Sequence, residues 1–290
     1  MRILITGSNG FIAQHVSTFL SADAEHDILA TSRSPSLINE VNFKQLDIRD
    51  REEAEKVISS FQPEVIIHAA ANGSADDCEL NKDVCDLINI TGTENISRTA
   101  GKVNSKVIFL STDFVFNGAS GPYCESDPVS PVNYYGRSKV MAEQIIANNN
   151  PNNCIVRLCS VYGRGISGSA RGIITLTKDK LTKGLSLNVV ADQIRTPTLV
   201  NDIAVAIKAM IEKNVSGIYH VSGEEVKTPY EMAIAAAKYF NLDDRLIIKT
   251  TSTALNEPAQ RPLRTGFVID KAKKALGFRP TGFDEGLKHF

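Results

Sequence analysis

The sequence lacks the features that mark secreted, membrane-bound and nucleic-acid-binding proteins. It has no apolar run of membrane-spanning length, and its N-terminus runs directly into a strand-like segment without the apolar stretch and cleavage site of a signal peptide. The formal net charge is −1, and no cluster of Lys and Arg is interleaved with aromatic residues. We therefore expect a cytoplasmic protein that binds neither membranes nor nucleic acids.

The patterns of cysteine and histidine argue against two further kinds of site. The five cysteines are odd in number, scattered and without CxxC spacing, which indicates neither a disulfide framework nor a zinc site. The five histidines form no H-x-x-H or H-E-x-x-H set, so we predict no required metal. With 290 residues, 42% of them hydrophobic, the chain can bury a substantial core without disulfide bonds or a bound metal.

Short β-branched runs alternate with helical patterns in the first half of the chain. This alternation predicts an α/β fold with a doubly wound parallel sheet of the Rossmann type, and several strands are apolar throughout, as strands covered on both faces should be. The expected strands are Arg2–Thr6, Asp27–Ser32, Phe43–Ile48, Val65–Ala71, Lys106–Ser111 and Cys154–Cys159, and the expected helices are Phe11–Ala22, Arg51–Phe61, Asn81–Lys102 and Tyr134–Asn148.

The pattern loosens after Gly163, which predicts a smaller lobe on the C-terminal side. We expect a dinucleotide-binding domain over residues 1–163, to which residues 201–222 return, and a smaller substrate-binding lobe over residues 164–200 and 223–290. The expected helices in this half are Ile173–Lys183 and Asn201–Lys213, and the expected strand is Gly217–Ser222. The segments expected to complete the smaller lobe are Pro229–Phe240, Leu246–Lys249 and Asp270–Gly277.

The first expected strand leads into a G-x-x-G-x-x-A sequence, Gly7-Ser8-Asn9-Gly10-Phe11-Ile12-Ala13. Glycine permits a tight turn and a close backbone approach, and the helix start offers unpaired N–H groups and the positive end of a dipole to a pyrophosphate. The sequence departs from the usual G-x-G-x-x-G fingerprint in two ways. Two residues rather than one separate Gly7 from Gly10, and Ala13 stands where the third glycine is usual. A tight turn without a ligand is the alternative, but the strand before and the amphipathic helix after favour a dinucleotide site.

The end of the second expected strand favours NADP(H) over NAD(H). Ligands lie outside the carboxyl ends of parallel strands, where an acidic residue normally binds the ribose 2′-hydroxyl. Here Ser32 and Arg33 stand at that end, whereas Asp27 opens the strand. A guanidinium suits a 2′-phosphate through paired, charge-assisted hydrogen bonds, although a solvated surface arginine is the alternative. NAD(H) stays open as the second choice of cofactor.

Tyr135 and Lys139 are spaced i, i+4, which puts both side chains on one face of a helix. A free phenol has a pKa near ~10 and exchanges protons poorly at neutral pH unless an ammonium group stabilises its phenolate, as Lys139 is placed to do. Taken alone, the two residues could equally form a surface pair. The strand that ends in Ser111 and Thr112 adds a hydroxyl that can hold a substrate carbonyl beside the phenol. Together with the glycine turn, these residues predict a hydride-transfer site.

These segments resemble the extended short-chain dehydrogenase/reductase family, and within it the dTDP-4-dehydrorhamnose reductase group. Besides the glycine turn, the matching segments are Ala69–Ala71, Asn89–Thr93, Ser111–Phe116, Asn133–Lys139, Arg157–Gly163, Asp192–Thr198 and Arg261–Pro262, and they span essentially the whole chain. The group typically carries a tryptophan in the segment that matches Leu158–Gly163. This chain has Ser160 there and no tryptophan anywhere, so the substrate is less closely indicated than the family.

The resemblance implies a role for each matching residue. It implies that Thr112 is the catalytic hydroxyl, Tyr135 the general acid, and Lys139 the residue that lowers the tyrosine pKa and holds the nicotinamide ribose. Further contacts with the cofactor are expected for Asp47, Ile48, Ala69, Ala70, Ala71 and Ser111, and contacts with the substrate for Asp113, Arg195 and Arg261. The two arginines could otherwise be ordinary salt-bridge partners in loops.

The implied function is the NADP(H)-dependent reduction of a 4-keto nucleotide sugar, in which Tyr135 protonates the oxygen of the reduced carbonyl. A 4-epimerase, which uses the same residues but keeps its cofactor through an oxidation and re-reduction cycle, is one alternative. A non-catalytic, NADP-binding regulatory subunit, similar to the one that partners methionine adenosyltransferase, is another. The sequence leaves open the sugar, the nucleotide, the reaction direction and the choice between a monomer and a homodimer.

Overall fold

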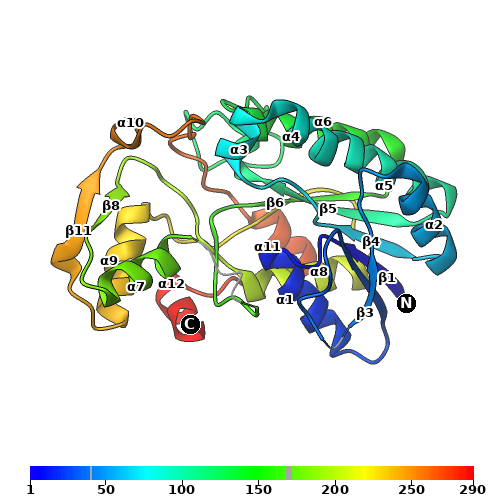
Figure 1. Cartoon of the computed structure of the whole chain (residues 1–290), viewed down its shortest axis with the longest axis horizontal. Coiled ribbons are helices and arrows are strands. Elements are labelled where there is room, and N and C mark those ends of the chain that lie inside the picture. The colour runs from blue at the N-terminus through cyan, green and yellow to red at the C-terminus, as the bar shows by residue number, and fades with distance from the viewer. Residues whose placement is uncertain (40, 168–171) are drawn as a thin grey trace.

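A seven-stranded parallel sheet forms the centre of the computed structural model, which describes residues 1–39, 41–167 and 172–290 (Figure 1). Its strand order is β10-β6-β5-β4-β1-β2-β3, so the chain begins in the middle, adds two strands on one side and then crosses to the other. The strands are β1 (Arg2–Thr6), β2 (Asp27–Ser32), β3 (Asn42–Gln45), β4 (Val65–His68), β5 (Lys106–Thr112), β6 (Cys154–Leu158) and β10 (Gly217–Val221). The expected doubly wound fold of the Rossmann type is confirmed, and the reversal at β1 is the place where such sheets bind ligands.

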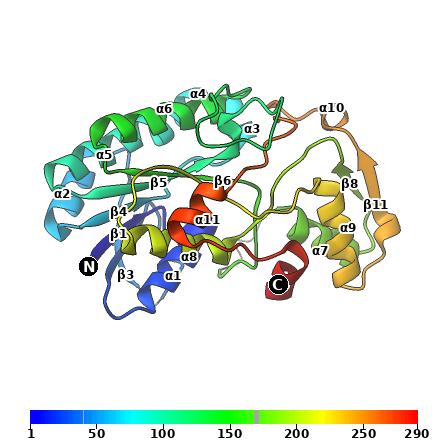
Figure 2. The ribbon, with the colours of Figure 1, turned by 180° about the vertical axis from the view of Figure 1, so that it is seen from behind.

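Helices cover both faces of this sheet (Figures 1 and 2). One face carries α1 (Phe11–Ser21), α8 (Val200–Glu212) and α11 (Asp270–Leu276), and the other carries α2 (Arg51–Phe61), α5 (Gly92–Lys102) and α6 (Tyr134–Asn149). Successive side chains of a strand point to opposite faces, so Val65 and Ile67 of β4 join the first apolar layer and Ile66 joins the second. Burial on both faces explains why the strand is apolar without alternation.

A smaller lobe lies at one end of the molecule, on the left in Figure 1. It contains the parallel pair β8 (Leu187–Val190) and β11 (Ile247–Thr250), with α7 (Ile173–Thr182), α9 (Pro229–Tyr239), α10 (Ser252–Leu255) and α12 (Phe283–Gly286). A capping box starts α9, since Thr228 and Glu231 each accept a hydrogen bond from the backbone of the other and Pro229 occupies the first turn. The short strands β7 (Val161–Tyr162) and β9 (Thr198–Leu199) also pair. Residues 168–171 of the range expected for this lobe lie outside the described residues.

The expected helix Asn81–Lys102 is not regular. It consists of α4 (Lys82–Asp86), a wider π-helical turn (Leu87–Thr91) and α5, and a further short helix, α3 (Ala75–Leu80), precedes it. In the π-helical turn the buried Asn89 amide donates hydrogen bonds to the carbonyl of Asn72 and the hydroxyl of Ser138. The strands β3 and β4 end three residues earlier than expected, so Leu46–Ile48 and Ala69–Ala71 follow the strands as irregular segments.

The helix α11 packs against elements of the main sheet. Residues 270–277 were expected in the smaller lobe, but α11 contacts β10 and α8 of the main sheet (Figure 2). Its buried side chains, Ala272 and Leu276, join the apolar layer that also contains Ile207 of α8. Within the described residues, no helix has both the length and the apolar character that crossing a bilayer requires.

Replacing Ile67 by Ala should destabilise the protein by about 2–5 kcal/mol, because it leaves a cavity at the centre of the sheet where the side chain is fully buried. The urea midpoint of unfolding, followed by circular dichroism, measures the effect. Leu176→Ala on the exposed side of α7 is the control and should change stability by less than about 0.5 kcal/mol. Equal midpoints for the two variants would contradict the layer arrangement.

Candidate active site

Two adjoining cavities lie at the carboxyl ends of the central strands. The first, of about 290 Å³, is lined by Gly7, Asn9, Gly10, Ser32, Arg33, Ser34, Leu46, Asp47, Ile48, Arg49, Ala69, Ala70, Ala71 and Ile88. The second, of about 430 Å³, is lined among others by Gly10, Phe11, Ile12, Ala69, Ala71, Ser111, Thr112, Asp113, Tyr135, Lys139 and Ser160. Most of the predicted cofactor residues therefore lie on one continuous stretch of surface. Ser8 is the exception, because it is fully buried and lines neither cavity.

The glycine turn brings the first strand against the end of β4. Gly7 has a φ of +67°, and a Cβ atom at this position would lie 2.6 Å from the Cα of Ala70, so only glycine fits. The amide of Gly10 donates to the carbonyl of Gly7 at 2.8 Å, and α1 then begins without a side-chain cap. The first amides of a helix have no acceptor within it, and Phe11 and Ile12, the first two residues of α1, line the second cavity. This geometry suits an anionic group such as a pyrophosphate.

Asn9 fixes the segment that follows β2. Its side-chain amide donates to the hydroxyl of Ser32 at 2.9 Å and to the carbonyl of Pro35 at 2.8 Å, and its oxygen accepts from the amide of Leu37 at 2.9 Å. This arrangement holds the exposed Arg33 at the mouth of the first cavity. Asn9 thus supports the cavity wall as well as lining it.

The first cavity contains a second arginine that the sequence analysis missed. Arg49 lines it and forms an ion pair with Asp47 at 2.6 Å. The hydrogen bonds from the Arg49 side chain lower the pKa of Asp47, and the charge of Arg33 adds a smaller effect in the same direction. The expected adenine-side residue Asp47 is therefore the ion-pair partner of Arg49.

The phenol of Tyr135 lies beside the end of β5. Asn133 caps α6 by accepting a hydrogen bond from the amide of Gly136 at 2.8 Å, and a Cβ atom on Gly136 would lie 2.2 Å from the carbonyl oxygen of Phe114. This close approach brings Tyr135 to the second cavity, where Thr112 also lies. The hydroxyl of Thr112 accepts from the amide of Phe114 at 3.2 Å and donates to Asp113 at 3.2 Å.

Burial sets the protonation of the two central residues. It raises the pKa of Tyr135 and is opposed by a hydrogen bond with Thr112, while the charge of Asp113 raises the pKa further. The resemblance implied a lowered tyrosine pKa, but in this structure desolvation outweighs the favourable contacts of the phenolate. Burial also lowers the pKa of Lys139 to about 7, and the charge of Glu143 opposes this shift. At neutral pH the phenol is thus a proton donor, and the amine exchanges protons readily.

Lys139 has a defined position between β5 and α6. Its Nζ donates to the carbonyl of Leu110 at 2.7 Å and lies 3.9 Å from the centre of the Phe109 ring. One helical turn later, Glu143 pairs with the buried Arg157 at 2.7 Å and accepts a hydrogen bond from Ser111. Ser111, expected at the cofactor, therefore lines the second cavity while its hydroxyl holds Glu143.

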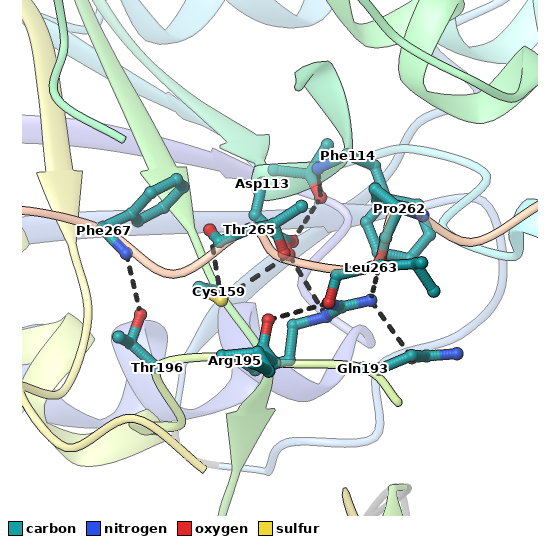
Figure 3. A network of polar contacts seen from close by, with 12 residues as sticks. Asp113, Phe114, Cys159, Gln193, Arg195, Thr196, Pro262, Leu263, Thr265 and Phe267 are labelled. Atoms are coloured by element: carbon teal, nitrogen blue, oxygen red, sulfur yellow. Dashed lines mark hydrogen bonds and ion pairs between the residues drawn. The ribbon is translucent and has the colours of Figure 1, made fainter. Parts of the chain in front are cut away.

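Asp113 and Arg195 form a buried pair next to Thr112 (Figure 3). The carboxylate lies 3.6 Å from Arg195 Nε and accepts hydrogen bonds from Thr265 and, at 3.5 Å, from Cys159. The other guanidinium nitrogens donate to Gln193 and to the carbonyls of Ile194, Pro262 and Leu263. Burial raises the pKa of Asp113, and the charge of Arg195 opposes this shift.

The three residues expected to contact the substrate all make polar contacts within the protein. Arg195 and Arg261, expected to face the substrate, line neither of the two cavities. Arg195 holds the segment around Pro262 in place, and Arg261 binds both oxygens of Asp76, at 2.9 and 2.7 Å. Asp113 does line the second cavity, but both of its oxygens already accept hydrogen bonds within the protein. The guanidinium groups find carboxylate and carbonyl partners inside the protein, which the sequence pattern could not specify.

His68 is a further residue that sequence reasoning missed. It is fully buried at the end of β4, with Nδ1 2.7 Å from the hydroxyl of Thr6 and Nε2 3.1 Å from that of Thr93. Burial lowers its pKa to about 3, so the ring is neutral. Thr6 also accepts from the amide of Ala70 at 3.2 Å, which ties the histidine to the floor of the first cavity. A polar residue at the end of an otherwise apolar strand was the available signal.

Comparison with known proteins places the chain in a family. The RmlD substrate binding domain family matches residues 1–290. The chain belongs to this family. The resemblance to the extended short-chain dehydrogenase/reductases and to the dTDP-4-dehydrorhamnose reductase group is thereby confirmed.

Known proteins are similar to this chain over nearly all of its length. A dTDP-4-dehydrorhamnose reductase of Aggregatibacter actinomycetemcomitans is 31% identical over 301 residues, which cover 99% of this chain and 97% of that protein. The methionine adenosyltransferase 2 subunit beta of Mus musculus is 31% identical over 293 residues, which cover 99% and 86%. The crystal structure of a dTDP-4-dehydrorhamnose reductase from Bacillus anthracis in complex with NADP aligns with a TM-score of 0.85 at 27% identity, covering 100% and 98%.

The lowered pKa of Lys139 predicts a pH dependence of stability. Between about pH 7 and pH 9 an unfolded lysine keeps its proton, whereas the folded one has released it, so unfolding takes up a proton. The free energy of unfolding of the natural protein, relative to Lys139→Met, should therefore rise with pH in this window by up to about 1.4 kcal/mol per pH unit. Urea unfolding at several pH values measures it. Lys238→Met removes an exposed lysine of α9, and the same pH dependence in that comparison would contradict the assignment.

Proposed function

We propose that this protein is an NADP(H)-dependent reductase of a 4-keto nucleotide sugar. The observation that carries the proposal is the gathering of Tyr135, Thr112 and Lys139 at a cavity that shares Gly10 and Ala69 with the cavity of Arg33. A proton donor thus adjoins a surface that suits a dinucleotide. The likeness to dTDP-4-dehydrorhamnose reductases along the whole chain supports the same function.

The residues present fit a dinucleotide phosphate. The close approach that only glycine allows at Gly7, and the uncapped start of α1, suit a pyrophosphate. Arg33, with Arg49 near it, suits the 2′-phosphate that distinguishes NADP(H) from NAD(H). We assign the ribose next to the nicotinamide to Lys139. When bound, the cofactor supplies the hydride.

The chain's own residues supply the proton. Reduction of a carbonyl adds a hydride at carbon and a proton at oxygen, and the buried, protonated phenol of Tyr135 donates that proton. The hydroxyl of Thr112 has one proton, which it donates to Asp113 in this structure. On substrate binding it would turn to donate this proton to the carbonyl oxygen and hold that oxygen beside the phenol. Lys139, with a pKa of about 7, returns a proton to the phenolate for the next turnover.

A spectrophotometric assay of NADPH oxidation with 4-keto dTDP-, UDP- and GDP-sugars tests the function. We expect stoichiometric consumption of NADPH and an alcohol at C4 of the product with at least one of these substrates, and faster turnover with NADPH than with NADH. An enzyme that retains tightly bound oxidised cofactor and consumes no NADPH would be a 4-epimerase, and the proposal would then be wrong.

Three further expectations from the sequence stay predictions. They are a homodimer, a cytoplasmic location and a substrate-binding role of the smaller lobe.

Tyr135→Phe should lower kcat by roughly 10²- to 10⁴-fold, because it removes the acid and leaves the ring in place. Binding of NADPH, measured by fluorescence titration, should be largely kept. Tyr134→Phe is the matched control, since its hydroxyl bonds Asp86 at 2.8 Å and it lines neither cavity, and it should keep near-natural turnover. Equal losses in both variants would show that the phenol at position 135 has no special role.

Arg33→Ala should weaken NADPH binding by about 10- to 100-fold, since it removes charge-assisted hydrogen bonds to the 2′-phosphate, and should leave NADH binding nearly unchanged. Dissociation constants for the two nucleotides measure this selectivity. Arg51→Ala, at the exposed start of α2 and outside the first cavity, should change neither. Parallel weakening of both nucleotides in Arg33→Ala would argue against the 2′-phosphate assignment.

A regulatory subunit is the second candidate. The observation that favours it is the 31% identity to the methionine adenosyltransferase 2 subunit beta, equal to that of the reductase relative. Binding of NADPH without turnover of any carbonyl in the assay, together with a stable complex with a methionine adenosyltransferase, would establish this candidate and exclude the reductase.

A further inference from the structure

Two thiols lie against each other beside the proposed active site. Cys78 of α3 and Cys85 of α4 are fully buried, and their sulfur atoms are 2.8 Å apart. The sulfur atoms of a disulfide are about 2.05 Å apart, so this pair is within roughly 1 Å of bonding distance. Neither residue lines the two cavities described above, and the mechanism does not use them.

The break between α3 and α4 brings the two cysteines together. Asn81, which separates the helices, has φ −127° and ψ 62°, a conformation outside the helical region. On a continuous helix, residues seven positions apart are about 10 Å apart along the axis, which is too far for a bond. The non-helical residue lets α4 fold back, so that Cys85 meets Cys78.

Asn89 connects the thiol pair to both cavities. Its side-chain nitrogen lies 3.4 Å from the sulfur of Cys85 and donates to the hydroxyl of Ser138 at 2.9 Å and the carbonyl of Asn72 at 3.1 Å. Ser138 stands in α6 between Tyr135 and Lys139, and Asn72 directly follows the cavity residue Ala71. A change in the sulfur positions would therefore act on the elements that hold the proton donor and the cavity floor.

The surroundings favour reaction at Cys85. Its hydrogen bond with Cys78 lowers the pKa of the Cys85 thiol; burial opposes this shift and Ser138 adds to it. The pKa of Cys78 is raised by the same hydrogen bond and by burial. The thiolate is the nucleophilic form of cysteine, and a hydrogen bond between two thiols stabilises the one that loses its proton, so one sulfur of the pair can attack and the other can resolve.

We propose that Cys78 and Cys85 form a reversible disulfide on reaction with a hydroperoxide, and that this bond lowers turnover at the neighbouring site. The Cys85 thiolate attacks a peroxide oxygen, which breaks the O–O bond and gives a sulfenic acid and, from hydrogen peroxide, hydroxide. The Cys78 sulfur then attacks the sulfenic sulfur. The S–S bond forms, the S–O bond breaks, and the departing hydroxide takes up the proton of the Cys78 thiol and leaves as water. Two thiols are oxidised by two electrons, and one peroxide is reduced. The effect on turnover rests on the proposed reductase function, whereas the disulfide itself does not.

Thiol counting and peptide mapping of the natural protein test the bond. After treatment with hydrogen peroxide and unfolding, the free thiols should fall from five to three. Trypsin cleaves after Lys82, so the bond should join the peptides Val57–Lys82 and Asp83–Arg98, and dithiothreitol should separate them. Separate peptides, or a loss of thiols that involves other cysteines, would overturn the proposal, and this result does not depend on any enzyme activity.

Turnover tests the connection to the site. Peroxide should lower NADPH-dependent turnover by roughly tenfold, since misplacement of a catalytic group by about 1 Å can cost more than this, and dithiothreitol should restore it. Cys85→Ala, compared with its own untreated sample, should lose this sensitivity, whereas Cys124→Ser, which removes a half-buried thiol elsewhere, should keep it. Equal sensitivity of the natural protein and Cys85→Ala would contradict the proposal, as would a mapped disulfide with unchanged turnover.

Discussion

The backbone of Gly7 approaches Ala70 so closely that no side chain fits between them, and the rest of the site depends on this contact. It sets the distance between the start of α1 and the end of β4, and the two cavities share residues from both. The hydrogen bond between Thr6 and His68 fixes the ends of β1 and β4 relative to each other. The neighbouring strand β5 then presents Thr112 at the same edge of the sheet.

The sequence predicted those features that depend on local chemistry. The period of apolar residues located the strands of the main sheet and most helices of both faces to within a few positions, whereas α5 begins eleven residues after the start of the expected helix Asn81–Lys102. The glycine turn could be recognised because only glycine tolerates its backbone, and Tyr135 and Lys139 because their spacing places both on one helix face. Boundaries were less accurate where a strand gives way to an irregular segment, as after His68, because the apolar pattern continues into the cavity wall.

The features that could not be predicted depend on partners far along the chain. The sequence around an arginine in a loop does not show whether its side chain faces a ligand or a buried carboxylate. The pairing of Arg195 with Asp113 follows only from the packing of three separate segments. The pKa shifts of Tyr135 and Lys139 have the same origin, because burial rather than spacing decides them. The π-helical turn at Asn89 likewise could not be predicted, because the residues before and after it have the ordinary pattern of an α-helix.

The hydrogen bond from Thr265 to Asp113 joins residues 152 positions apart in the chain. During synthesis the ribosome releases the N-terminal end first, so the glycine turn, Thr112 and the Tyr135–Lys139 pair emerge while both main partners of Asp113 are still missing. Until residues 195 and 265 arrive, the carboxylate next to Thr112 lacks the groups that hold it. The geometry of the proton-transfer site is thus completed late in translation, and a chain cut short before residue 265 would carry the sequence motifs of the family without their finished arrangement.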